Sequence, residues 1–285
     1  MQPDDIVIKN ESLTVTVSPL GAEMQSVTDA RGTERLWNGD PAYWTGRAPV
    51  LFPYAGGLKE DRYELDGKVY ENCPKHGFAK VSRFTVEKAD DTSAVFLLTE
   101  KTEFYPFDYA FRVSYALEGS SIRVSYSCTD TGTAPLYYSV GCHEAYAAPG
   151  GIEHYRLVFP EDESFMHSVL RGSQITKDLV PMAPDGKVLP LKEEQFTIDA
   201  MVFLSLRSRS VRLENDLNDD RVEISYPGHP YLLVWKKPQA PYVCVEPWVN
   251  PPSYTTDPID LKAKRGIQRL EPGETRVHEH VIRFS

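Results

Sequence analysis

The sequence predicts an all-β protein, a large antiparallel β-sandwich formed by residues 1–285 as a single domain. Two observations lead to this fold class. Short runs of β-branched and aromatic residues recur along the whole chain, and Gly, Pro, Asp or Asn closes most of them. Helical periodicity is scarce. The clearest expected strands cover residues 6–8, 13–17, 94–99, 111–117, 121–129, 155–159, 202–206, 222–226, 231–236, 242–247 and 278–284.

Turn residues separate these runs. Glycine reaches the positive φ that tight turns require, so we expect a hairpin at each of several Gly-containing tripeptides. These are Leu-Asp-Gly at 65–67, Leu-Glu-Gly at 117–119, Asp-Thr-Gly at 130–132, Pro-Asp-Gly at 184–186 and Glu-Pro-Gly at 271–273. No Gly/Ser-rich or charge-dense segment of linker length interrupts the pattern, and all-β domains often reach this length, which indicates one domain.

Composition and charge narrow the class of function. Hydrophobic residues make up 41% of the chain and the formal net charge is −10, with a pI near 5.3. No Lys/Arg cluster is long enough to hold a polyanion, so we expect no nucleic-acid partner. The acidic start of the chain does not resemble a signal peptide, and no apolar run has the length of a membrane span. We therefore expect a cytoplasmic protein without a membrane partner.

The chain contains four cysteines, and no two of them have the CxxC spacing. Without an export signal we expect them to be reduced thiols. They are Cys73, Cys128, Cys142 and Cys244.

Three segments carry residues suited to acid–base chemistry. Glu246 ends an apolar strand and is followed by Pro and Trp, which places a carboxylate where burial is costly unless the group is paired or used. His143 follows a β-rich run and a glycine, and His76 lies in a Lys-His-Gly turn. One carboxylate and two imidazoles offer a base and an acid near neutral pH without a cofactor. Each of the three also has a simpler interpretation, as a turn residue or an exposed strand end.

The other histidines fit structural positions better. His154 and His167 lie in a charged segment, and His229 lies in a Pro-Gly-His-Pro turn. His278 and His280 alternate on what reads as a polar C-terminal strand, and no third metal ligand is evident beside them.

In sequence and order, these segments resemble the aldose 1-epimerase superfamily and, within it, the LacX-like branch. The resemblance spans nearly the whole chain. It rests on Arg47 to Pro53 with Leu58, Lys59 and Tyr63, on His76-Gly77-Phe78-Ala79, on Gly141-Cys142-His143, on Tyr231 to Trp235 with Val243 to Trp248, and on Leu270 to Glu274.

The resemblance implies a β-sandwich of the galactose mutarotase type that binds a sugar in an open cleft. By this resemblance Glu246 would be the base, His143 the acid, and His76 a hydrogen-bond partner near C1, with neither a cofactor nor a metal. The family's early arginine is absent, because Gly57 stands where it is expected. Expected sugar contacts are Arg47, Lys59, Arg62, Asp199, Tyr146, Trp235 and Trp248.

Three alternatives remain open at this point. The substrate could be a hexose 6-phosphate, since Arg47, Lys59, Arg62, Lys75 and Lys80 lie near His76 in sequence. The chain could be a carbohydrate-binding protein without activity, because Gly57 alters the expected grip. A zinc site could form if Cys73 and His76, Cys142 and His143, or Cys244 and Glu246 converge. The sequence names neither the sugar nor the oligomeric state.

Overall fold

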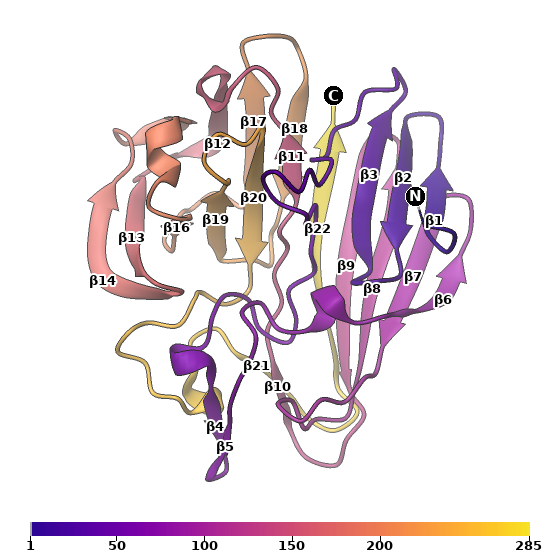
Figure 1. The fold of residues 1–285 in the computed structure, drawn as a ribbon, viewed down its shortest axis with the longest axis vertical. Helices are drawn as coiled ribbons and strands as arrows, with labels where there is room; N and C mark the ends of the chain where they lie inside the picture. Colours follow the sequence, from indigo (N-terminus) through magenta and orange to yellow (C-terminus); the bar gives the residue numbers. More distant parts are fainter. Residues whose placement is uncertain (1) are drawn as a thin grey trace.

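The computed structural model describes residues 2–285 and is dominated by antiparallel strands (Figure 1). One layer is a nine-stranded sheet whose neighbours follow the order β15-β12-β17-β18-β22-β9-β8-β7-β6. Its strands are β6 (Thr85–Ala89), β7 (Ser93–Leu98), β8 (Tyr109–Glu118), β9 (Ser121–Asp130), β12 (Tyr155–Glu163), β15 (Gly186–Pro190), β17 (Ser210–Asn215), β18 (Arg221–Ser225) and β22 (Thr275–Phe284).

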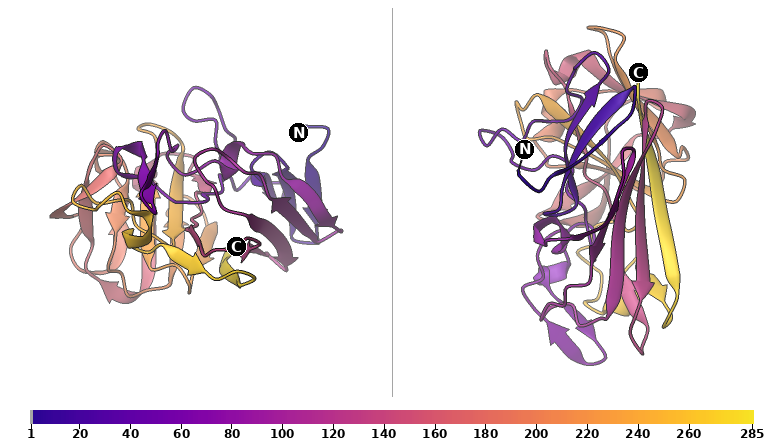
Figure 2. Two further views of the ribbon diagram at one scale, coloured as in Figure 1. Left: turned by 90° about the horizontal axis from the view of Figure 1, so that it is seen from below. Right: turned by 90° about the vertical axis from the view of Figure 1, so that its right-hand side faces the viewer.

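Two smaller sheets face this large sheet. The first has the order β1-β2-β3 and the second the order β11-β20-β19-β16. Figure 2 shows the indigo strands β1 to β3 as a layer separate from the large sheet. The strands are β1 (Ile6–Lys9), β2 (Leu13–Ser18), β3 (Glu23–Asp29), β11 (Ala145–Ala147), β16 (Met201–Phe203), β19 (Tyr231–Trp235) and β20 (Tyr242–Trp248).

Short hairpins, bridging strands and single helical turns complete the chain. The remaining strands pair as β4 (Tyr63–Leu65) with β5 (Lys68–Tyr70), β10 (Leu136–Tyr138) with β21 (Gln268–Leu270), and β13 (Met166–Arg171) with β14 (Gln174–Pro181). The helical turns are η1 (Lys59–Asp61), η2 (Ala79–Val81), η3 (Ile152–His154), η4 (Glu193–Phe196) and η5 (Leu261–Ala263). No helix within residues 2–285 combines the length and apolar character needed to cross a membrane.

The main core lies between the large sheet and the two smaller ones. Side chains of a strand alternate between its two faces, and in β9 buried and half-buried residues alternate over the whole strand. Val15 and Val27 of the first small sheet and Val243 of the second belong to the same apolar cluster as Phe111 and Ile282 of the large sheet. Burial of this shared interface holds the layers together.

The predicted all-β fold class is confirmed, and every expected strand coincides with an observed strand within a few residues. The turns were predicted less well. Residues 65–67 and 117–119 do connect paired strands, β4–β5 and β8–β9. The tripeptides at 130–132, 184–186 and 271–273 instead lead from one sheet to another. The turn residues of these tripeptides specify a tight turn, but they do not determine which strand the following segment pairs with.

The C-terminal strand also differs from its predicted character. His278 and His280 are 8% and 0% exposed, because they share the inward face of β22 with Ile282 and Phe284. All four cysteines are buried free thiols.

Candidate functional site

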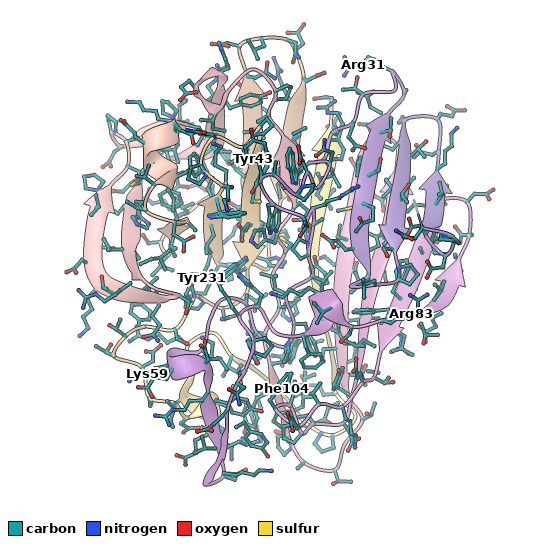
Figure 3. The ribbon with its side chains drawn as sticks, viewed as in Figure 1. Arg31, Tyr43, Lys59, Arg83, Phe104 and Tyr231 are labelled. Atoms are coloured by element: carbon teal, nitrogen blue, oxygen red, sulfur yellow. The ribbon has the colours of Figure 1, made fainter. Side chains whose placement is uncertain are left out.

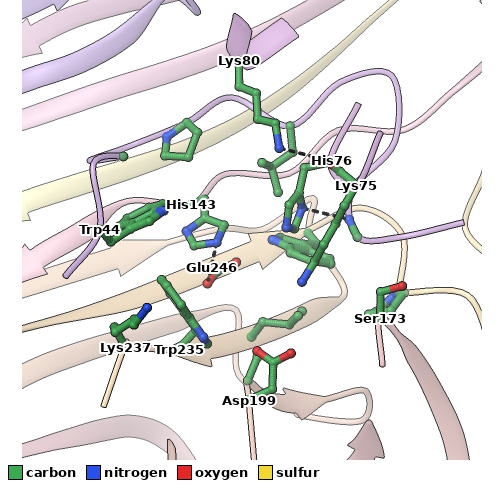
Figure 4. A pocket seen from close by; sticks show the side chains of 18 of the residues that line it. Trp44, Lys75, His76, Lys80, His143, Ser173, Asp199, Trp235, Lys237 and Glu246 are labelled. Carbon is green, nitrogen blue, oxygen red and sulfur yellow. Dashed lines mark hydrogen bonds and ion pairs between the residues drawn. The ribbon is translucent and has the colours of Figure 1, made fainter. Parts of the chain in front are cut away.

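A cleft of about 550 Å³ opens on the outer face of the β11-β20-β19-β16 sheet (Figure 4). This volume lies within the range of small-molecule sites. Strands β19 and β20 form its floor, and loops far apart in sequence form its walls. Residues lining the cleft include Glu23, Tyr43, Trp44, Gly46, Lys75, His76, Lys80, His143, Ser173, Asp199, Leu233, Trp235, Lys237, Glu246 and Trp248.

Strand β20 places Glu246 on the floor of the cleft. All residues of β20 are buried, but the two faces of the strand contact different parts of the molecule. Val243 and Val245 belong to the main core, whereas Glu246 and Trp248 line the cleft. This division follows from the two-residue repeat of a strand.

The same alternation decides which residues around β11 reach the cleft. His143 lines it, whereas Glu144 and Tyr146 point to the opposite side. The carboxylate of Glu144 accepts a hydrogen bond from Nε2 of His280 at 2.9 Å. Glu144 therefore does not face His143. Tyr146, expected to stack on a sugar, is instead fully buried in the main core, where its ring packs 6.5 Å from that of Phe284.

Glu246 and His143 form a buried carboxylate–imidazole pair. Oε1 of Glu246 lies 3.4 Å from Nε2 of His143, and the side chains are 2% and 10% exposed. This contact is longer than a good hydrogen bond, and Oε1 has no hydrogen-bond partner within the described residues 2–285. A buried carboxylate oxygen facing a cleft is thus available to a ligand hydroxyl.

Burial shifts both protonation equilibria against the charged forms. It raises the pKa of Glu246 well above its usual range, against the opposing positive charge of Lys75. It lowers the pKa of His143 to about 3, and the charges of Lys75 and Lys80 act in the same direction. The pair therefore favours one shared proton, held on the carboxyl group.

His76 has a fixed tautomer. Its Nδ1 lies 3.1 Å from the backbone N–H of Gly56, which can only donate, so Nδ1 accepts. Burial keeps the pKa of His76 well below its usual value, and the neutral ring carries its proton on Nε2. The next residue, Gly77, has φ 67°, and a Cβ at this position would lie 2.1 Å from the carbonyl oxygen of Phe52, so only glycine fits here. The turn thus presents one N–H donor to the cleft.

Asp199, Trp235 and Trp248 also line the cleft, whereas three predicted sugar contacts lie elsewhere. Arg47 donates to the carbonyl of Gln25, and Arg62 pairs with Glu60. Nζ of Lys59 donates to the carbonyl of Asp257 at 2.8 Å. Figure 3 shows Lys59 beside β4, apart from Tyr43 at the cleft. These three residues are near His76 in the sequence, but their side chains do not line the cleft.

The cations of the cleft are Lys75, Lys80 and Lys237. Lys75 and Lys80 come from the His76 loop and η2, whereas Lys237 follows Leu233 and Trp235 in the alternation that begins in β19. That alternation is a sequence signal that could have identified Lys237.

Gly57 cannot be replaced by a larger residue without moving its neighbour. A Cβ at Gly57 would lie 2.4 Å from Oγ of Ser173, in the turn between β13 and β14. Ser173 itself lines the cleft. The β13–β14 hairpin therefore occupies the space that a side chain at position 57 would need.

Trp44 is a cleft residue that the sequence did not reveal. Its ring centroid lies 5.1 Å from that of His143, and Trp235 lies 5.6 Å from the same imidazole. The three residues are far apart in the chain, and Trp44 lies in a loop whose sequence, Tyr43-Trp44-Thr45-Gly46, matches no motif. No local pattern predicts this contact.

Two groups of side chains within residues 2–285 have potential metal-ligand atoms within 4.8 Å of one another: Cys142, Glu144 and His280, and His143, Cys244 and Glu246. Burial raises the pKa of both thiols well above the usual value, which disfavours the thiolate that zinc requires. His278 is bonded elsewhere, with Nε2 2.9 Å from the hydroxyl of Tyr138.

A β-sandwich with a buried carboxylate–imidazole pair in a cleft is a protein with a site suited to acid–base chemistry. Residues 4–283 match the family model described as aldose 1-epimerase, and the chain belongs to this family. The chain is 31% identical to Protein LacX, chromosomal, of Lactococcus lactis subsp. lactis, over 95% of its own length and 96% of that protein.

Solved structures of similar proteins share the whole fold. A galactose mutarotase related enzyme from Lactobacillus acidophilus matches with a TM-score of 0.91 and 29% identity, over 99% of this chain and 97% of that one. A galactose mutarotase-like protein from Lactobacillus casei matches with a TM-score of 0.92 and 25% identity, over 99% of this chain and 100% of that one. The galactose mutarotase type of sandwich is therefore confirmed.

Proposed function

We propose that the protein is an aldose 1-epimerase, or mutarotase, that interconverts the α and β anomers of an aldose without a cofactor. The observation that carries this proposal is the buried pair in the cleft, with Glu246 Oε1 unpaired and 3.4 Å from His143 Nε2. The names of the relatives from Lactobacillus support the same reaction. We further place the protein in the cytoplasm, which its four free thiols support.

The reaction moves two protons, and the pair can exchange both. The carboxylate of Glu246 accepts the proton of the C1 hydroxyl while the imidazolium of His143 donates one to the ring oxygen. The bond between C1 and the ring oxygen breaks, and an open-chain aldehyde forms. After rotation about C1–C2 the released hydroxyl attacks the other face of the carbonyl, and both protons return.

Burial suits this proton exchange. The resting pair holds its proton on the carboxyl group of Glu246, and transfer of that proton to His143 gives the reacting form, a carboxylate and an imidazolium. Ring opening then returns the pair to a carboxylic acid and a neutral imidazole. The pair therefore carries one proton both before and after ring opening. Because burial disfavours both charged forms, the cleft stabilises the state that follows proton transfer. The return step then regenerates the charged pair.

Other lining residues would hold the sugar. We assign Nε2–H of His76 as a donor to an oxygen near C1, consistent with its tautomer. Asp199 can accept from sugar hydroxyls, and the indoles of Trp235 and Trp248 can pack on apolar ring faces.

The decisive experiment follows the optical rotation of freshly dissolved α-glucose and α-galactose with and without protein. We expect the protein to accelerate mutarotation, and Glu246→Gln to lower kcat/KM by about 10² to 10⁴, the usual contribution of a positioned acid–base group. Glu60→Gln, outside the cleft, is the matched control. Near-normal rates for Glu246→Gln would show that the base is misassigned. Saturable sugar binding without acceleration would indicate a non-catalytic carbohydrate-binding protein.

Hexose 6-phosphates are a second candidate substrate, and the lysines favour them. Lys75, Lys80 and Lys237 line the cleft of a chain with a net charge of −10. Ammonium groups in such a setting attract a phosphate dianion. A higher kcat/KM for glucose 6-phosphate than for glucose would establish this candidate, and equal values would dismiss it.

A further inference from the structure

We propose that Trp44 is a positioning residue of the epimerase reaction: its indole holds the imidazole of His143 in place and keeps water from the His143–Glu246 pair, and Gly46 makes this arrangement possible. The inference builds on the proposed function. It rests, however, on contacts that can be tested without any sugar.

Aromatic rings surround the imidazole of His143. The ring of Trp44 is tilted by 36° at 5.1 Å, and the ring of Trp235 meets the imidazole edge-on, at 77° and 5.6 Å. Trp44 and Trp235 also contact each other, with centroids 5.3 Å apart. On the other side His76 lies 5.6 Å away, and Figure 4 shows Trp44 and His76 flanking His143. The imidazole therefore has little freedom to turn.

The loop that carries Trp44 is fixed by hydrogen bonds. The backbone N–H groups of Tyr43 and Trp44 both donate to the carbonyl of Asp40 at 3.0 Å. The indole N–H of the buried Trp37 donates to the carbonyl of Trp44 at 2.7 Å. The backbone N–H of Trp37 in turn donates to the carbonyl of Ala145 in β11 at 2.9 Å, which ties the loop to the sheet beneath it and holds the indole over His143.

Gly46 provides the space that the indole occupies. A Cβ at this position would lie 2.5 Å from Cζ2 and 2.8 Å from Cε2 of Trp44. Real Cβ atoms do not approach ring carbons so closely, so a side chain at residue 46 would push the indole away from its position. Gly46 is thus required because of space, whereas many other glycines of the chain are required by a positive φ.

Several charged or titratable groups act on His143. Glu246 and Cys244 face it from β20, and His76 faces it from the neighbouring loop. Lys75 and Lys80 disfavour its protonation, but the largest effect is burial. Because Trp44 provides part of that burial, its removal should hydrate the imidazole and raise its pKa from about 3 toward the ordinary value.

The test compares Trp44→Ala and Gly46→Ala with a glycine control. Gly228→Ala is suitable because a Cβ there would meet nothing within 4 Å. The readout is the imidazole signal of His143 in NMR spectra of the sugar-free protein, assigned with His143→Gln and followed between pH 8 and 5.5. In the unmodified protein and Gly228→Ala we expect no titration in this range. In Trp44→Ala and Gly46→Ala we expect titration to begin within it.

Kinetics supply a second readout. We expect both loop variants to lose on the order of tenfold to a hundredfold in kcat, as small misplacements of a reacting group do, with a smaller change in KM. Unchanged titration and unchanged kcat in both variants would overturn the inference. If the unmodified protein epimerises no sugar, the proposed function fails, and the titration still decides whether Trp44 shields His143.

Discussion

Lys75 acts on both members of the pair through its charge. Burial raises the pKa of Glu246, and Lys75 is the main charge that opposes this rise. Lys75 also contributes to the lowered pKa of His143. The side chain forms no ion pair within the part of the chain that the structure describes. Its charge is therefore free to bias the protonation of the pair.

We predict that Lys75→Met moves the pH–rate profile to higher pH. Activity requires one proton on the pair, so it is lost at low pH when His143 binds a second proton and at high pH when Glu246 loses the shared one. Without Lys75 both pKa values rise, and both limbs of the profile move upward. Measuring kcat between pH 5 and 9 tests this on the high-pH limb, because the low-pH limb follows the pKa of about 3 of His143 and lies below this range. Lys59→Met, outside the cleft, should leave the limbs in place, and a Lys75→Met profile that matches it would contradict the prediction.

The sequence singled out Glu246, His143 and His76, and all three line the cleft, but it did not predict the residues that surround them. Glu246 could be singled out because a carboxylate directly after an apolar run, here residues 242–245, is a local pattern. The burial of Tyr146 could also have been predicted, from the alternation of side chains along a strand. Residues 143 and 146 of an extended chain point to opposite faces, so Tyr146 cannot share the cleft with His143. The contact of Trp44 with His143 could not be predicted, because it forms between segments that are distant in the sequence and meet only in the folded chain.

At the scale of elements, the β13–β14 hairpin determines what position 57 can hold. Its turn residue Ser173 fills the space beside Gly57, so a residue with a side chain at position 57 is incompatible with this hairpin turn as it stands. The contact between residues 57 and 173 could not be predicted from the sequence, because no local pattern at either position indicates that they meet.

We predict that Gly57→Ala lowers the free energy of unfolding by about 1–3 kcal/mol, the usual cost of overpacking a closed site. Ser173→Gly should cost less alone and should recover most of the loss when combined with Gly57→Ala. Urea unfolding of the two single variants and the double variant measures this coupling. Additive losses would show that the residues do not meet.

At the scale of the whole molecule, buried histidines make stability depend on pH. Burial lowers the pKa of five of them: to about 3 for His143, to about 4 for His167 and His278, and well below the usual value for His76 and His229. The unfolded chain binds these protons near pH 6.5 and the folded chain does not. Their contribution is therefore complete above pH 6.5 and is lost as the pH falls.

We predict that the free energy of unfolding drops between pH 7 and 5.5, by about 1.4 kcal/mol per pH unit for each fully unmatched proton. Glu23 and Glu246, whose pKa values burial raises, oppose this trend, but the histidines outnumber them. Urea midpoints at the two pH values measure the effect. His229→Leu should reduce the difference, whereas His154→Gln, at a partly exposed side chain, should not. Equal midpoints at both values would refute the prediction.

Strand β20 has a consequence for how the chain finds its fold. A slip of one residue against β19 would turn Val243 and Val245 toward water and force the Glu246 carboxylate among the apolar side chains of the interior. Burying an unpaired carboxylate there would cost several kcal/mol. The carboxylate that lines the cleft thus also disfavours misaligned pairing of β20 during folding. A chain whose core is correctly assembled has the Glu246 carboxylate in the cleft.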